Sequence, residues 1–206
     1  MEEVFTIGYT AFPDIKDFID VLKKYKINSI IDVRSEPVSE YYKLYNKNNI
    51  SLTLNNNNIL YANFRDEFGA RQTDIKYFTN GILDFEKFYT SEQFQSGFLR
   101  VKNGLNKGYR IAFMCAEKRP ETCHRNIMIA KYFYKNGYEI KNILHDKTFI
   151  NQREIEKILL DKYFPNRFQL SLFENLNEEG MINEAYKKAN KEIGFKLENI
   201  YSEEMF

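Results

Sequence analysis

The scarce reactive side chains of this chain are concentrated in one short stretch. Residues 113–133 contain both cysteines, Cys115 and Cys123, together with Glu117 and one of the two histidines, His124. Side chains of these types serve as nucleophiles, as general acids and bases, as metal ligands or as anion binders. The stretch is therefore the first place to look for a functional site.

Thiol chemistry is one interpretation of this stretch. Cys115 ends a predicted strand, and as a nucleophile it needs a pKa lowered by a cation or a helix N-terminus, which Lys118, Arg119 and the following helix could supply. A free cysteine at a buried strand end is also commonly inert packing. The spacing from Cys115 to Arg125 is too long for the Cys-x5-Arg loop of thiol phosphatases.

Metal binding is a second interpretation, because two cysteines and a histidine are ligand types that zinc prefers. A helix is predicted over Glu121–Lys135, and adjacent residues of a helix point about 100° apart, so Cys123 and His124 are not expected to share an ion. The chain also has no Cys-x-x-Cys pair. We therefore predict no metal site and no cofactor, and expect Cys123 to face the core.

Anion binding is the third interpretation. His124 and Arg125 lie near the predicted N-terminus of the helix over residues 121–135, where backbone N–H groups are free. A helix N-terminus with cationic side chains is suited to hold a phosphate or a carboxylate. The sequence favours this interpretation over the other two.

The elements that must position these residues follow a regular alternation. Short apolar runs predict strands at Val4–Ile7, Ser29–Val33, Ile59–Asn63, Arg110–Cys115 and Tyr138–Leu144, with helical patterns between them. Strand, crossover helix and strand imply parallel pairing. We predict an α/β fold: a three-layer Rossmann-like domain with a mostly parallel sheet of about five strands over residues 1–150, then a helical tail over 151–206. A polar loop at 64–74 is expected to be a lid, and residues 82–89 a helix.

In an open parallel sheet, ligands bind outside the carboxyl ends of the strands. The polar residues expected at this edge are Tyr9, Thr10, Asp32, Arg34, Arg71, Cys115, Glu117, His124 and Arg125. Among them, Asp32, Glu117 and Cys115 are the catalytic candidates and the others are the substrate-binding candidates. Asp32 and Arg34 could equally form a simple ion pair.

Composition limits the function classes. The chain has 206 residues, and its 30 basic and 29 acidic side chains argue against a broadly basic coat for nucleic acid. No leader peptide is visible, and no apolar run approaches the roughly 20 residues that span a bilayer. Two cysteines are more typical of free thiols than of a disulfide. We expect a cytoplasmic protein without a membrane partner.

Four motifs resemble a known family. The segments FTIGYT (5–10), IDVRSEP (31–37), EFGAR (67–71) and FMCAEKRPETCHR (113–125) together resemble the bacterial and archaeal family called domain of unknown function 488, over about residues 4–150. The resemblance implies an α/β fold with a pocket built from these motifs, and it implies no reaction. The family usually has Gly-His-Ser where this chain has Gly8, Tyr9 and Thr10, so Tyr9 or Thr10 would have to replace that histidine. Where the family typically has Leu-Gly-Gly-Arg, this chain has Phe68, Gly69, Ala70 and Arg71.

The tail contains a separate motif, QLSLF at Gln169–Phe173. It matches the peptide that binds the bacterial DNA sliding clamp, in which Leu172 and Phe173 would fill an apolar pocket and Gln169 would hydrogen-bond at its edge. The same residues could instead dock on their own domain.

Two classes of function remain open. The first is an enzyme acting on a nucleotide, nucleoside or nucleic acid, with phosphate at the start of the helix over 120–135, Arg34 and Arg71 as clamps, and Glu117 or Asp32 as acid or base. The alternative is a non-catalytic ligand-binding or replication and repair module, tethered to the sliding clamp through Gln169–Phe173.

Overall fold

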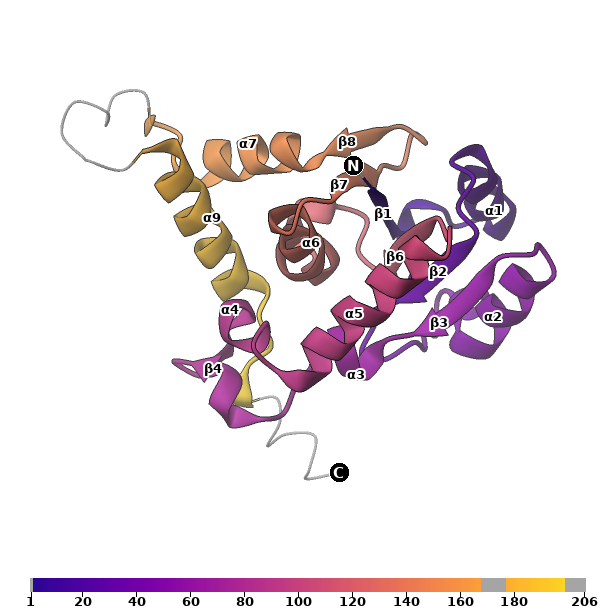
Figure 1. The fold of residues 1–206 in the computed structure, drawn as a ribbon, viewed down its shortest axis with the longest axis horizontal. Helices are drawn as coiled ribbons and strands as arrows, with labels where there is room; N and C mark the ends of the chain where they lie inside the picture. Colours follow the sequence, from indigo (N-terminus) through magenta and orange to yellow (C-terminus); the bar gives the residue numbers. More distant parts are fainter. Residues whose placement is uncertain (1, 168–176, 199–206) are drawn as a thin grey trace.

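A mixed α/β architecture is seen in the computed structural model, which describes residues 2–167 and 177–198. The central sheet has six strands in the order β3-β2-β6-β1-β7-β8 (Figure 1). Their bounds are β1 Glu3–Gly8, β2 Ser29–Asp32, β3 Leu60–Asn63, β6 Ile111–Cys115, β7 Glu139–Ile143 and β8 Phe149–Asn151. The first five are mutually parallel and β8 pairs antiparallel with β7. The five predicted strands and the mostly parallel sheet are thus confirmed.

Helices cover both faces of the sheet, because the central strands β1, β2 and β6 are almost entirely buried. On one face, α1 (Ile15–Lys24) and α2 (Lys47–Asn55) pack on side chains of β1, β2 and β6 (Figure 1). Asp14 caps α1, whose buried stripe contains Phe18, Val21 and Leu22. On the other face lie α5 (Glu92–Asn106) and the helical run that ends in α6 (Lys131–Lys135).

Two local predictions between β3 and α5 are confirmed only in part. The expected lid at 64–74 begins with a short helix, α3 (Arg65–Phe68), and the apolar rings of Phe64 and Phe68 are buried in the core. The expected helix at 82–89 is instead a hairpin strand followed by α4 (Phe85–Phe88), which Asp84 caps. The hairpin consists of β4 (Phe78–Thr79) and β5 (Ile82–Leu83), and a 3-10 turn, Ile75–Tyr77, precedes it.

The C-terminal helices belong to the same hydrophobic core as the sheet. Helix α7 (Gln152–Tyr163) begins with a capping box formed by Asn151 and Glu154, and α9 (Glu178–Ile193) follows it. Buried side chains of both helices join the cluster that covers the α5 face of the sheet. Residues 152–163 and 178–193 are helical, as expected for this part of the chain, whereas Gln169–Phe173 lies outside the described residues. No helix in the described ranges combines the length and apolarity needed to cross a membrane.

The connection after β6 is not one continuous α-helix. A 3-10 turn at Pro120–Thr122 is followed by Cys123 in extended conformation, with φ −129° and ψ 139°. Residues Arg125–Ala130 then form a π-helix that runs into α6. The remaining 3-10 turns are Tyr9–Ala11 after β1 and Lys43–Tyr45 before α2. π-Helical turns are rare in proteins, and those that do occur are often found at functional sites.

Candidate metal centre

Four side chains with metal-ligating atoms converge beyond the carboxyl end of β6. The ligand atoms of Cys115, Glu117, Cys123 and His124 all lie within 4.8 Å of one another. Oε2 of Glu117 accepts from both thiols, with 2.8 Å to Sγ of Cys115 and 2.9 Å to Sγ of Cys123. Nδ1 of His124 lies 3.8 Å and 4.0 Å from the same two sulfur atoms.

The break in the helix explains this convergence. Had Cys123 and His124 lain on one α-helix, their side chains would point about 100° apart. Cys123 is extended instead, and the helical backbone begins only after it. The prediction that these two residues lie on one regular helix and point apart is therefore wrong. Cys123 is buried among core residues, as expected, yet its sulfur faces Glu117.

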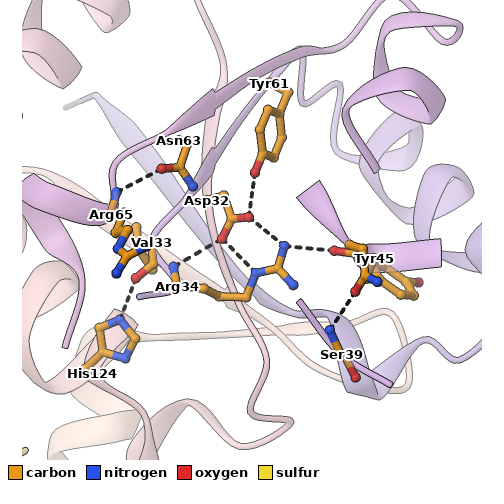
Figure 2. Close-up of polar contacts among 10 residues, drawn as sticks. Asp32, Val33, Arg34, Ser39, Tyr45, Tyr61, Asn63, Arg65 and His124 are labelled. Atoms are coloured by element: carbon orange, nitrogen blue, oxygen red, sulfur yellow. Dashed lines mark hydrogen bonds and ion pairs between the residues drawn. The ribbon is translucent and has the colours of Figure 1, made fainter. Parts of the chain in front are cut away.

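The imidazole of His124 is held in one orientation by the neighbouring strand. Its Nε2 lies 2.9 Å from the carbonyl oxygen of Val33, just beyond β2 (Figure 2). In the neutral ring, Nε2–H donates to that carbonyl and Nδ1 presents its lone pair to the two sulfur atoms. A histidine whose second nitrogen donates to a backbone carbonyl is the usual arrangement around a metal ion.

Electrostatics within the cluster separates the two thiols. Burial raises the pKa of the Cys115 thiol well above its ordinary value. Burial also works against a Cys123 thiolate, but hydrogen bonding from Cys115 and the charge of Arg125 outweigh it and lower the pKa of Cys123 to about 6. Glu117 is exposed as a residue, and although desolvation of its carboxylate opposes ionisation, His124 and the two thiols lower its pKa to about 2. Despite burial, Cys123 and Glu117 raise the pKa of His124.

The loop that carries Glu117 is fastened from two sides. Arg125 is fully buried and donates from Nη1 to the carbonyl of Glu117 at 2.5 Å and from Nη2 to that of Lys118 at 3.4 Å. From the 3-10 turn after β1, the Thr10 hydroxyl donates to the carbonyl of Ala116 at 2.6 Å. Arg125 and Thr10, both predicted to bind substrate, therefore hold the backbone of the Glu117 loop.

Gly8 is where this loop approaches β1 most closely, so we expect Gly8→Ala to distort the cluster. A Cβ atom at Gly8 would overlap the carbonyl oxygen of Glu117, which is backbone and is already bound by Arg125. Overpacking of this kind costs about 1–3 kcal/mol. Urea unfolding measures the loss. Gly108→Ala is the control in which no atom lies near the new methyl group, although its positive φ adds strain of its own. An unchanged stability of Gly8→Ala would contradict the close approach.

Asp32 and Arg34 form a buried pair beside the cluster (Figure 2). Arg34 donates from Nε to Oδ1 at 2.8 Å and from Nη2 to Oδ2 at 2.6 Å, while the Tyr61 hydroxyl donates to Oδ2 at 2.7 Å. Nη2 also reaches the carbonyl of Tyr45 at 2.8 Å. Asp32 and Arg34 thus form the ion pair that the sequence analysis gave as the alternative to a catalytic and a substrate-binding role.

Tyr9 follows β1 and lies in an aromatic cluster with Tyr42 and Tyr45. Its ring stacks on Tyr45 at a centroid distance of 4.5 Å, and the guanidinium of Arg34 lies over its face at 5.0 Å. Burial raises the pKa of Tyr9, and Arg34 opposes that shift. Arg71 contacts the loop after β2: its N–H donates to Oγ of Ser35 at 2.9 Å and its guanidinium pairs with Glu36.

Buried donors without acceptors are found at the same edge. Within residues 2–167 and 177–198, three buried side-chain atoms make no hydrogen bond: Nη1 of Arg34, Nδ2 of Asn63 and Nε of Arg125. All three are N–H donors. Arg34 and Asn63 lie at or just beyond the carboxyl ends of β2 and β3, and Arg125 begins the π-helix and reaches the loop after β6 through the carbonyl of Glu117. An edge with spare donors favours ligands that offer acceptor oxygens.

Sequence reasoning selected Cys115, Glu117 and His124 but placed Cys123 in the core. The residues were visible as Cys-x-Glu followed by Cys-His. What the pattern did not contain was the extended conformation of Cys123. The structure brings these four residues together, and it binds Arg34 and Arg125 to internal acceptors.

Comparison with known proteins gives one result. The family model described as "Domain of unknown function DUF488" matches residues 14–132, more than half of the 206 residues. No curated protein and no solved structure shows a significant match to this chain. The match includes β2, β6 and all four residues of the cluster. The chain therefore belongs to the DUF488 family.

Proposed function

We propose that this chain is a metalloprotein that binds a zinc-class divalent ion through Cys115, Cys123 and His124, with Glu117 on the solvent side. The observation that carries the proposal is the convergence of four ligand atoms within 4.8 Å, from residues separated in sequence by a loop and a turn. Three of the four residues are buried, so the pocket is already desolvated before an ion enters it.

The donor set fits such an ion. Zinc binds thiolate sulfur at about 2.3 Å and imidazole nitrogen at about 2.0 Å in a tetrahedron, which places ligand atoms roughly 3.5 Å apart. The distances from Nδ1 of His124 to the two sulfurs, 3.8 Å and 4.0 Å, need only a small contraction. Thiolates and imidazole select zinc-class ions over magnesium and calcium, which prefer oxygen.

Hydrolysis is the reaction class that this arrangement supports best. Catalytic zinc sites use three protein ligands and keep one position open for water. Glu117 is the exposed member of the cluster and is placed to exchange with water and to act as general acid or base. Two cysteines, one histidine and a non-ligand glutamate form the set used in hydrolytic deamination of nucleobases.

A nucleotide-like substrate is the finer part of this proposal. Support comes from the unpartnered donor atoms of Arg34, Asn63 and Arg125, which suit an anionic ligand. Arg34 and Asn63 also lie at the carboxyl ends of parallel strands, where Rossmann-like folds bind nucleotides. The non-catalytic alternative, with tethering to the sliding clamp through Gln169–Phe173, stays a prediction, because those residues lie outside the described part of the chain.

Metal content tests the proposal directly. We expect purified chain to bind about one zinc ion per molecule, measured by elemental mass spectrometry after dialysis, and His124→Ala to lose most of it. His145→Ala is the matched control, since His145 is the other histidine and is exposed at the turn after β7. Equal zinc content in both variants would refute the metal centre.

Glu117→Gln separates binding from catalysis. We expect this variant to retain the ion, held by the three buried ligands, and to lose hydrolysis of a panel of nucleotides and nucleosides by a factor of about 10²–10⁴. A wild-type protein that binds zinc but turns over no member of the panel would favour the non-catalytic alternative. In that case the proposed metal centre would be supported and the proposed nucleotide-like substrate would be rejected.

A further inference from the structure

A second candidate site lies away from the metal cluster, under helix α9. A cavity of about 400 Å³ is enclosed by the β4–β5 hairpin, the start of α4, the π-helix with α6, and one side of α9. In Figure 1 the hairpin and α4 lie beside the end of α9 that leads to the C-terminus. None of the four metal-cluster residues lines this cavity.

The wall of the cavity is preformed rather than loose. Asn190 of α9 donates from Nδ2 to the carbonyl of Leu83 at 2.8 Å and accepts from the N–H of Phe85 at 2.9 Å. The segment after α9 also pairs with the hairpin, because the N–H of Leu83 donates to the carbonyl of Phe195 at 2.8 Å. Ligand pockets of this size are usually formed before the ligand binds.

The floor of the cavity is apolar and one of its walls carries a buried cation. Ile82 is the partly accessible apolar side chain of this floor, and Leu83, Phe85 and Ile127 beside it are fully or almost fully buried. The side chain of Lys131 is only 4% exposed, with Nζ 3.1 Å from Oε1 of Glu86 and 4.5 Å from the centroid of the Tyr186 ring. Burial lowers the pKa of Lys131, and Glu86 opposes the shift.

Three lysines and two acids line the cavity, and two of these lysines already have acidic partners. The lysines are Lys131, Lys187 and Lys191, and the acids are Asp84 and Glu86. Lys131 pairs with Glu86, and Nζ of Lys187 lies 2.6 Å from Oε1 of the half-exposed Glu184. The carboxylate of Asp84 is already occupied: it accepts from two N–H groups of the first turn of α4 and from the hydroxyl of Thr79. Glu86 is half exposed, so it can turn outward when another acid reaches Lys131.

We propose that this cavity binds a small organic acid with an apolar body, which lies on the floor while its carboxylate pairs with Lys131 and faces Lys187 and Lys191. The chemistry is that of many cofactor and metabolite pockets, in which a mostly apolar wall carries a few charged groups. The wall supplied by α9 lies beyond residues 14–132, so the site depends on a part of the chain outside the family match.

A matched pair of probes tests this inference. Phenylacetate and phenylacetamide have nearly the same shape and differ in charge, and their binding to the full ¹⁵N-labelled chain can be followed by amide chemical shifts. We expect saturable shifts at the amides of residues 82–86 and 186–191, with phenylacetate bound at least tenfold more tightly. Equal affinity of the two probes, or saturable shifts elsewhere only, would overturn the proposal, as would a lack of saturation with phenylacetate.

Two substitutions sharpen the test. Lys131→Gln is expected to reduce the ratio of phenylacetate affinity to phenylacetamide affinity at least tenfold. If that variant fails to fold, Lys187→Glu on the exposed side of α9 is expected to weaken phenylacetate alone by about threefold or more. Lys188→Glu is the control, because Lys188 lies on the same helix over the ring of Phe164 and does not line the cavity. If Lys188→Glu weakened phenylacetate binding as much as Lys187→Glu does, a specific role for the cavity would be refuted.

Discussion

Asp32→Ala is expected to destabilise the fold by about 3–5 kcal/mol, because it leaves a buried guanidinium without its counter-ion. Arg34 is 4% exposed and directs two of its nitrogen atoms to the carboxylate of Asp32. Its remaining contacts, the carbonyl of Tyr45 and the face of Tyr9, do not neutralise the charge. The loss would be measured by urea unfolding of variant and wild type.

Tyr61→Phe provides the matched control for this prediction. It removes a single hydrogen bond to Oδ2 of Asp32 and keeps the ion pair, so a loss of only about 1 kcal/mol is expected. The double change Asp32→Ala with Arg34→Met should recover part of the loss, since no buried charge remains. If Asp32→Ala cost no more than Tyr61→Phe, the pair would not be the buried unit that the structure indicates.

Zinc is expected to raise the free energy of unfolding by about 4 kcal/mol when free zinc stands at a thousand times its dissociation constant. The reason is linkage: an ion that binds only the folded arrangement of Cys115, Cys123 and His124 shifts the folding equilibrium toward it. Thermal unfolding with and without a chelator measures the effect on the same preparation.

The variants for this measurement follow from the cluster. Cys123→Ser should abolish the response to zinc, because it removes a soft ligand from the centre of the cluster, whereas His145→Ala should respond as wild type does. A zinc response that persists in Cys123→Ser would locate the ion elsewhere. No response in the wild type would remove the metal centre and leave the thiols as a packed, hydrogen-bonded group.

The sheet and its functional edge could be predicted because the interior strands are short apolar runs separated by helical patterns. Residues of β1, β2 and β6 had to end at one edge once they were parallel, which is why Asp32, Cys115 and Glu117 could be selected from the sequence. The sixth strand, β8, was missed because Phe149–Asn151 is a short edge strand without alternation.

Other features could not be predicted, since they depend on contacts between distant segments. Arg34 and Arg125 look like ligands for an anion in the sequence, but Asp32 and the carbonyl of Glu117 bind them. The hairpin at 78–83 is formed against the segment after α9, more than 100 residues later, through the pairing of Ile82 with Lys196. Local pattern alone gave no signal for that pairing.

The sequence by itself determined the α/β alternation and the edge of the sheet at which Cys115, Glu117 and His124 were expected to lie together, as they do. Only the tertiary structure decided that Cys123 joins them. Its sulfur reaches Glu117 because the backbone is extended at that one residue, between a 3-10 turn and a π-helix, and Arg125 holds the Glu117 loop in place. A spacing rule for a regular helix places the two adjacent ligands apart, whereas the packed loop brings them together.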